Sequence, residues 1–446
     1  MNELNKNIAP KLNGLKNIFR SLQYRNYRLF FAGQSISLVG TWIQSIAVPW
    51  LVYSLTGSPF LLGLAGFAGQ IPTFIISPFA GVLIDRWNRR TILVATQILA
   101  MVQSLVLAFL YFDNSITVWN IILLSVILGS INAFDMPARQ SLVVDMIEKK
   151  EDLGNAIALN SSMFNAARLI GPSIAGMLIA FAGEGICFLV NGISYILVII
   201  FLLMMKISPR KTKEKNTHVI QELKEGFKYV FGFMPIRYII LLLALISLVG
   251  MPYTVLMPIF AKTILHGGSH TFGFLMGASG IGALTGSIYM ASRKSILGIG
   301  KFIPIFASVF GLGLIGFSLS QEFSLSLVLM LIIGSGMIMQ MTSSNTILQT
   351  IADDDKRGRV MSFYTMAFIG IAPFGSLLAG VLANSIGAPN TLIIGGALSV
   401  LGAIVFALKL PMIQKMVRPI YIRLGVIQKL DSGIKSATEL TIPPLE

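Results

Sequence analysis

Charged side chains are rare inside the long apolar stretches of this sequence, and Asp135 and Arg168 are two of them. At membrane depth an ionised side chain costs several kcal/mol unless it is paired or hydrated. Asp135 shares one helical face with Asn132 and Arg139, at spacings of three and four residues. We therefore expect Asp135 to pair with Arg139 in its own helix or with Arg168 in the next.

Two interpretations of these three charges stay open. In the first, Asp135, Arg139 and Arg168 form a charge relay, in which the carboxylate exchanges its partner for a proton or a substrate during a cycle. In the second, the carboxylate forms a fixed salt bridge that locks two neighbouring helices together. Normal pH-coupled transport by Asp135→Asn would remove the first interpretation.

A stripe of polar side chains marks the first apolar helix, where they recur at intervals of three, four and three residues. Such a stripe on an otherwise apolar helix should face a wet cavity. Weaker polar sets follow in later helices. The expected lining of a substrate cavity is Gln34, Ser37, Thr41, Gln44, Asn132, Asn165, Met251, Tyr253, Thr254, Met337, Gln340 and Ser344. The alternative for each residue is a hydrogen bond to a neighbouring helix.

The elements that must position these residues are membrane-spanning helices. Of the 446 residues, 54% are hydrophobic and only 12% are charged, which is typical of a membrane protein. One crossing needs about 20 apolar residues. The expected fold is all-α and integral to the membrane, with twelve transmembrane helices as two six-helix bundles related by pseudo-symmetry. The expected spans are 27–54, 59–84, 91–112, 117–144, 154–182, 184–205, 237–264, 271–292, 299–320, 323–350, 360–384 and 389–411.

The net charge of +15 follows membrane topology and does not indicate nucleic-acid binding. All but three of the 34 Lys and Arg residues lie on one side of the expected spans, and the exceptions are Arg139, Arg168 and Lys262. By the positive-inside rule this side is cytoplasmic, and an even number of spans leaves both termini there. We expect a multi-pass protein of a bacterial inner membrane that contacts lipid.

The chain divides into two bundles and a charged linker. The expected segments are a cytoplasmic amino-terminal segment 1–26, bundles at 27–205 and 237–411, a linker at 206–236 and a cytoplasmic tail at 412–446. Apolar residues recur at helical spacing in the linker, which predicts an amphipathic surface helix, although its first ten residues fit a disordered tether equally well. Similar acidic loops and prolines in the two halves indicate a duplicated six-helix unit, as in many secondary transporters.

The loop after the second span carries the most specific motif. It reads Gly81-Val-Leu-Ile-Asp85-Arg86-Trp-Asn-Arg89-Arg90. This resembles the G-x-x-x-D-R-x-x-R-R cytoplasmic loop of the Major Facilitator Superfamily, with Asn88 where the family often has glycine. The resemblance implies an inward-closing latch, in which Asp85 pairs with Arg89 or with another helix. The alternative is the ordinary basic flank of a membrane helix.

Two further motifs lie in the fourth and fifth spans. The runs from Asn132 to Gln140 and from Asn165 to Arg168 resemble the superfamily branch of enterobactin exporters and macrolide-efflux proteins, the transmembrane secretion effector type. The fifth span also contains Gly171, Pro172 and Gly176. This glycine-proline pattern resembles the antiporter-associated motif of exporter branches of the superfamily. Its alternative interpretation is tight helix packing.

These residues favour a transporter over an enzyme, because no serine, histidine or paired-carboxylate arrangement sits at membrane depth. The sequence has no Gly-x-x-x-x-Gly-Lys-Ser/Thr loop, so we expect a proton gradient as energy source and no cofactor. Three His and one Cys predict no metal site. The resemblance implies a monomer that exports a small organic molecule, a siderophore or a drug-like compound, by alternating access. Metabolite import, lysophospholipid flipping and a non-transporting membrane scaffold or sensor are the alternatives.

Overall fold

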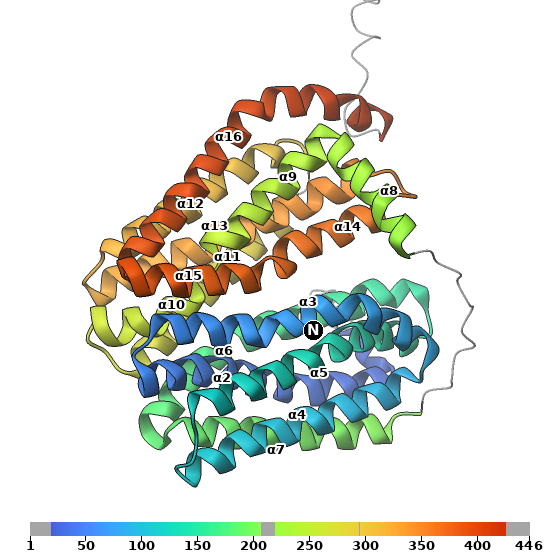
Figure 1. Ribbon diagram of the computed structural model, residues 1–446. Coiled ribbons are helices and arrows are strands. Elements are labelled where there is room, and N and C mark those ends of the chain that lie inside the picture. The colour runs from blue at the N-terminus through green and yellow to red at the C-terminus, as the bar shows by residue number, and fades with distance from the viewer. Residues whose placement is uncertain (1–18, 207–218, 294, 425–446) are drawn as a thin grey trace, which may run out of the picture.

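The computed structural model describes residues 19–206, 219–293 and 295–424. Within these ranges twelve helices are long and apolar enough to cross a membrane, which confirms the twelve expected spans. They form two bundles, the blue-to-green layer and the yellow-to-red layer of Figure 1. The first bundle consists of a short 3-10 helix (Arg20–Gln23), α2 (Arg25–Thr56), α3 (Pro59–Arg86), α4 (Arg89–Phe112), α5 (Val118–Asp145), α6 (Lys150–Ala182) and α7 (Glu184–Met204).

The second bundle follows the linker helix α8 (Val219–Gly232). Its seventh and eleventh spans are each built from two α-helices, which are joined through irregular turns. The elements are α9 (Met234–Leu245) with α10 (Tyr253–Ile259), α11 (Ser269–Ser292), α12 (Ile299–Leu319), α13 (Phe323–Ile351), α14 (Arg357–Thr365) with α15 (Ala372–Ile386), and α16 (Ala388–Arg423).

The irregular turns are π-helical, and they belong to the second bundle. The seventh span contains them at Ile246–Gly250 and Phe260–Ile264, and the eleventh span at Met366–Gly370. The Ser247 hydroxyl donates to the Phe368 carbonyl oxygen at 2.6 Å, which joins one turn to the other. Because π-helical turns often occur at functional sites, these two spans are the ones whose backbone could rearrange. Their first-bundle counterparts, α2 and α6, are continuous α-helices.

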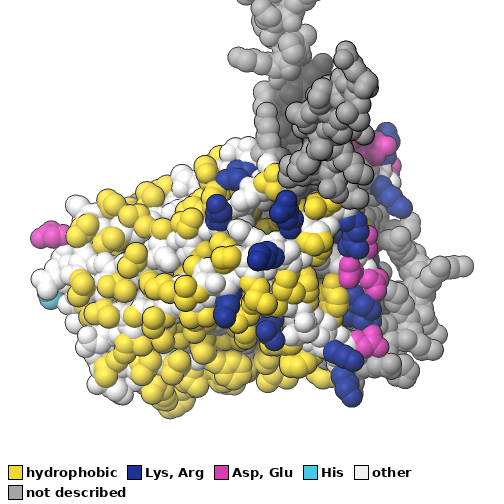
Figure 2. All heavy atoms as spheres, turned by 90° about the horizontal axis from the view of Figure 1, so that it is seen from above, with side chains coloured by type: hydrophobic (Ala, Val, Ile, Leu, Met, Phe, Trp, Pro, Cys, Tyr) yellow, Lys and Arg dark blue, Asp and Glu magenta, His cyan; other side chains and the backbone are white. Residues whose placement is uncertain are grey.

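Lys and Arg side chains gather toward one end of the molecule, here called the basic end, as Figure 2 shows for the face seen from above. The bundles touch near the opposite end through glycines. A Cβ on Gly63 would lie 2.6 Å from the Gly380 Cα, and one on Gly176 would lie 2.9 Å from the Gly273 Cα. Small residues allow such backbone-to-backbone contact between membrane helices. At the opposite end, α3 therefore packs directly on α15, and α6 on α11.

The inner face of the first bundle is accessible near the basic end. Met136 of α5 and Ile157 of α6 are 50% and 53% exposed. Leu123 and Ile170, about 140° further round the same two helices, are also exposed, so α5 and α6 each expose more than one side. The structure is thus closed between the bundles at the opposite end, and Met136 and Ile157 are exposed near the basic end.

Two segments at the basic end are helical beyond the expected spans. The expected amphipathic linker helix is present as α8, whose Arg359–Glu225 ion pair (2.7 Å) and Phe227–Phe363 ring contact attach it to α14; residues 207–218 lie outside the described ranges. The last span was expected to end at 411, but α16 continues to Arg423 because its buried Ile413 and Val417 extend the apolar face.

Candidate functional site

The carboxylate of Asp135 is buried inside the first bundle, with 2% of the residue exposed. Its Oδ1 accepts hydrogen bonds from Thr96 Oγ1 at 2.9 Å and from Gln97 Nε2 at 2.7 Å. Its Oδ2 forms an ion pair with Arg139. The sequence left open whether Asp135 pairs with Arg139 or with Arg168, and in the structure it pairs with Arg139.

The helices bring this cluster together for simple geometric reasons. Asp135 and Arg139 are four residues apart on α5, so their side chains are neighbours on one face. Thr96 and Gln97 belong to α4, which packs against α5. Sequence reasoning missed these two residues. Their signal was a pair of adjacent polar side chains in an otherwise apolar span, a pattern that recurs at Gln103 and Ser104.

Gln44 is the centre of a second buried polar cluster in the first bundle. Its Oε1 accepts from Ser104 Oγ at 2.6 Å and from Asn191 Nδ2 at 2.7 Å, and its Nε2 donates to Gln103 Oε1 at 3.1 Å. The partners come from α4 and α7, so Gln44 points into its own bundle. In this conformation it holds three helices together.

The other members of the polar stripe on α2 differ in their exposure. Gln34 and Ser37 are 1% and 3% exposed, and Gln34 Nε2 has no hydrogen-bond partner. Thr41 is exposed and donates to the Ser37 carbonyl oxygen at 3.0 Å, a bond within its own helix. Part of the stripe is therefore sealed inside the bundle, and only Thr41 is open to solvent.

Three predicted residues lie on the inner side of α5 and α6. Asn132 and Asn165 are half-buried, and Asn165 Nδ2 donates to the Ser161 carbonyl oxygen at 2.9 Å within α6. Arg168, also half-buried, forms no hydrogen bond or ion pair with any described residue. The structure therefore separates Arg168 from the Asp135 cluster.

The predicted residues of the second bundle are mostly buried. Tyr253 is 1% exposed and its hydroxyl lies 3.0 Å from Ser279 Oγ, while Thr254 donates to the Met251 carbonyl oxygen at 3.2 Å. Gln340 Nε2 donates to Ser344 Oγ at 3.2 Å. Met337, Gln340 and Ser344 all lie inside the second bundle, with at most 4% exposed.

The basic motif after α3 anchors helix ends to one another. Arg89 pairs with Asp145 at the end of α5 at 2.7 Å. Arg90 donates to the carbonyl oxygens of Leu202 and Leu203 at 2.7 and 2.6 Å, which holds the start of α4 against the end of α7. The last turns of α3 contain Gly81, Asp85 and Arg86. The structure does not describe the side chains of Asp85 and Arg86.

The glycine-proline motif of α6 lies at two helix contacts. A Cβ on Gly171 would lie 2.4 Å from the Trp42 Cβ of α2, and one on Gly273 would lie 2.6 Å from the Pro172 carbonyl oxygen. Together with Gly176, these residues let α6 approach α2 on one side and α11 of the other bundle on the next. The motif is therefore part of the bundle interface, and α6 stays helical through Pro172.

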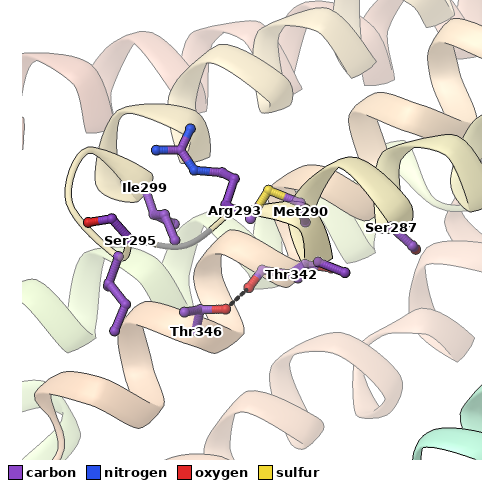
Figure 3. Close-up of a pocket in the computed structure, with 9 residues that line it drawn as sticks. Ser287, Met290, Arg293, Ser295, Ile299, Thr342 and Thr346 are labelled. Carbon is purple, nitrogen blue, oxygen red and sulfur yellow. Dashed lines mark hydrogen bonds between the residues drawn. The ribbon is translucent and has the colours of Figure 1, made fainter. Parts of the chain in front are cut away.

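A pocket of about 330 Å³ lies away from all of these residues, where α11 meets α12 and α13 at the basic end (Figure 3). Its one charged lining residue is Arg293, whose guanidinium points away from Thr342 and Thr346. That guanidinium packs over the Phe302 ring at 4.5 Å. Among the described lining residues the one charged group, Arg293, thus packs on an aromatic ring, and the Asp135 cluster remains the candidate site. Among the described residues no group of three His, Cys, Asp or Glu side chains could hold a metal ion.

Comparison with known sequences gives one consistent picture. Residues 17–420 match the family model described as transmembrane secretion effector, of the Major Facilitator Superfamily type. The staphyloferrin A transporter of Staphylococcus aureus is 26% identical over 380 residues, covering 85% of this chain and 95% of that protein. Macrolide efflux protein A of Streptococcus pyogenes is 24% identical and covers 86% of this chain and 96% of its own.

Solved structures share the fold at lower identity. A bacterial homologue of the iron transporter ferroportin, in its inward-facing state, has a TM-score of 0.67 at 16% identity, with 87% of this chain and 98% of that chain covered. A bacterial homologue of the lysosomal transporter Spinster, inward-facing and unoccupied, has a TM-score of 0.67 at 13% identity, with 88% and 98% covered. At these identities the likeness shows the two-bundle fold alone.

Proposed function

Because this chain belongs to the transmembrane secretion effector family of the Major Facilitator Superfamily, we propose that it is a proton-driven exporter of a small organic molecule. The observation that carries the proposal is the buried Asp135 carboxylate with its three partners. A carboxylate in this position is the group that a proton could neutralise during a transport cycle.

The surroundings of Asp135 suit an exchange of partners. Thr96 and Gln97 are neutral, so protonation of Asp135 leaves Arg139 as the one charge of the cluster. Arg139 is already incompletely bonded, because its Nε is buried without a hydrogen-bond partner. An unpaired buried cation is unfavourable, so loss of the Asp135 charge would drive Arg139 toward a new anion or toward water. A proton and a rearrangement of α5 would thus be coupled.

The two-bundle architecture supplies the conformational change. The basic end is proposed to be cytoplasmic, with both termini on that side, by the positive-inside rule. The structure then corresponds to a state open toward the cytoplasm, in which the glycine contacts between α3 and α15 and between α6 and α11 close the outer side. Rocking of one bundle against the other would reverse these contacts. Both bundles belong to one chain, so a monomer is sufficient.

Substrate and energy source follow from the same reasoning. The relatives are named as a transporter of a siderophore and as efflux proteins for macrolides or several drugs. These names support a siderophore or a drug-like compound as the substrate, and a bacterial inner membrane as the location.

One proton entering through about 150 mV releases roughly 3.5 kcal/mol. Each tenfold concentration step of a neutral solute costs about 1.4 kcal/mol, so one proton would sustain a gradient of more than two decades.

Inverted membrane vesicles with an imposed pH gradient, acidic inside, test the proposal. Staphyloferrin A and a macrolide are offered separately as probes. The proposal expects wild-type vesicles to accumulate at least one probe and a control variant, Glu322→Gln in an exposed loop, to match them. Asp135→Asn should lose accumulation. Accumulation in right-side-out vesicles under the opposite gradient, acidic outside, would instead indicate proton-coupled import, and pH-independent movement of a lysophospholipid would indicate a flippase.

A further inference from the structure

Arg168 lies on the innermost side of α6. Met177, nine residues further on and therefore about two and a half turns away, is 41% exposed on the outer surface. Ala175, seven residues from Arg168 and thus nearly on the same side, is 0% exposed. The Arg168 side chain accordingly points away from lipid and toward the interior of the molecule.

Within the described part of the chain, no carboxylate is paired with Arg168. Arg168 forms no hydrogen bond or ion pair with the described residues, and both oxygens of the Asp135 carboxylate are occupied by Thr96, Gln97 and Arg139. None of the Arg168 nitrogens is among the buried polar atoms that lack a partner, so the guanidinium keeps contact with solvent. The residue as a whole is half-buried.

The second bundle contributes hydroxyl groups next to Arg168. In the second bundle the hydroxyl of Tyr253 lies 3.0 Å from Ser279 Oγ. The backbone of Arg168 also lies at the α6–α11 contact, because a Cβ on Gly280 would be 3.5 Å from the Arg168 carbonyl oxygen. Arg168 therefore lies on the part of α6 that packs against α11 of the second bundle.

We propose that Arg168 is the receptor for an anionic group, a carboxylate, of the transported molecule. The inference rests on the proposed export function and names its substrate class, an organic anion. An accessible cation at membrane depth that pairs with no described residue attracts an anion, and a substrate carboxylate would pair with it. The planar guanidinium offers two parallel N–H donors to a carboxylate, a geometry that lysine cannot provide. Binding at the bundle interface would place the substrate between α6 and α10.

A substrate-independent test measures the electrostatic attraction itself. The single cysteine, Cys187, is 0% exposed and is replaced by alanine, and Asn165 is replaced by cysteine as a reporter one turn before Arg168. The rates of reaction with sulfonatoethyl and trimethylammonioethyl methanethiosulfonate are then compared. Because the ratio of the two rates cancels steric access, it reports local charge.

Arg168→Gln should slow the anionic reagent and speed the cationic one, each by about tenfold. Arg168→Lys should keep the ratio, and Lys409→Gln, which removes an exposed positive charge elsewhere, should leave it unchanged. An unchanged ratio in Arg168→Gln would overturn the proposal, since the reporter would then see no attractive site. This outcome is independent of whether the protein exports anything.

The second test identifies the chemistry of the cargo. Media from cells that produce the wild type, Arg168→Lys, Arg168→Gln or Asp135→Asn are compared by untargeted mass spectrometry. Compounds that require Arg168 should carry carboxylates, and their extracellular level should fall at least tenfold in Arg168→Gln. Equal loss of neutral or cationic compounds would contradict anion recognition. If the wild type exports no compound, the export proposal fails, while the reagent ratio still decides the role of Arg168.

Discussion

Replacing Gly176 by alanine should push the two bundles apart at the opposite end. A Cβ at this position would lie 2.7 Å from the Ser269 carbonyl oxygen and 2.9 Å from the Gly273 Cα. Both are backbone atoms, so the contact is relieved only if α6 and α11 separate. Overpacking of this kind costs about 1–3 kcal/mol. The cost applies only to the state in which the helices touch, so the conformational equilibrium should shift roughly 5- to 150-fold away from it.

Spin labels on the exposed residues Glu148 and Asp354 report this shift, because they lie at the basic end of different bundles. Electron–electron resonance distances should become shorter in Gly176→Ala as the basic end closes. Gly154→Ala is the matched control, since it lies on the same helix and its Cβ would meet no atom within 4 Å. A folded Gly176→Ala protein with the wild-type distance distribution would refute the reasoning.

Three further outcomes are expected. Gln44→Leu removes hydrogen bonds from buried polar side chains, and each unsatisfied group costs about 1–3 kcal/mol. The thermal unfolding temperature in detergent should therefore fall. An unchanged unfolding temperature would show that the cluster does not stabilise the fold. Glu225→Arg breaks the ion pair with Arg359 and should make α8 more susceptible to proteolysis, and adding Arg359→Glu should restore its protection. The ion pair is partly exposed, so its contribution is below about 1 kcal/mol. Full protection of α8 in the single variant would contradict this prediction. The hydrogen bond to Asp152, together with burial and the carboxylate charge, raises the pKa of Tyr24 above its ordinary value of 10.0, so this contact stabilises the fold below that pH and is lost as pH rises through the raised pKa. Asp152→Asn should lower the ultraviolet titration midpoint of Tyr24, and a Tyr24→Phe difference titration identifies the signal.

The sequence was sufficient for the twelve spans, because the length and apolar character of each helix are set by the thickness of the hydrocarbon layer. It also showed that Asp135 and Arg139 share one helix face, since residues four apart are neighbours on a helix. The choice between Arg139 and Arg168 was not predictable. It depends on how α5 packs against α4 and α6, and α4 supplies the two additional partners Thr96 and Gln97.

The sequence does not show whether a polar stripe on a helix faces a cavity or the interior of its own bundle. The pattern on α2 shows which residues share a face, but not what that face contacts. Gln44 points into its own bundle because Ser104 and Asn191 of two other helices satisfy it there. The π-helical turns were also unpredicted, because they arise from tertiary contacts such as the bond from Ser247 to the Phe368 carbonyl. That these residues line a substrate cavity in another conformation stays a prediction.

If Asp135 couples a proton to transport, its loss should affect gradient-driven accumulation but not exchange at equal pH. Proteoliposomes with wild type or Asp135→Asn are loaded with the transported compound and assayed for counterflow at equal pH and for accumulation under a pH gradient. Asp135→Asn should retain counterflow and lose accumulation, because only the protonation step is removed. Retention of pH-driven accumulation, or loss of both activities in a folded protein, would contradict the claim and leave Asp135 as a structural salt bridge.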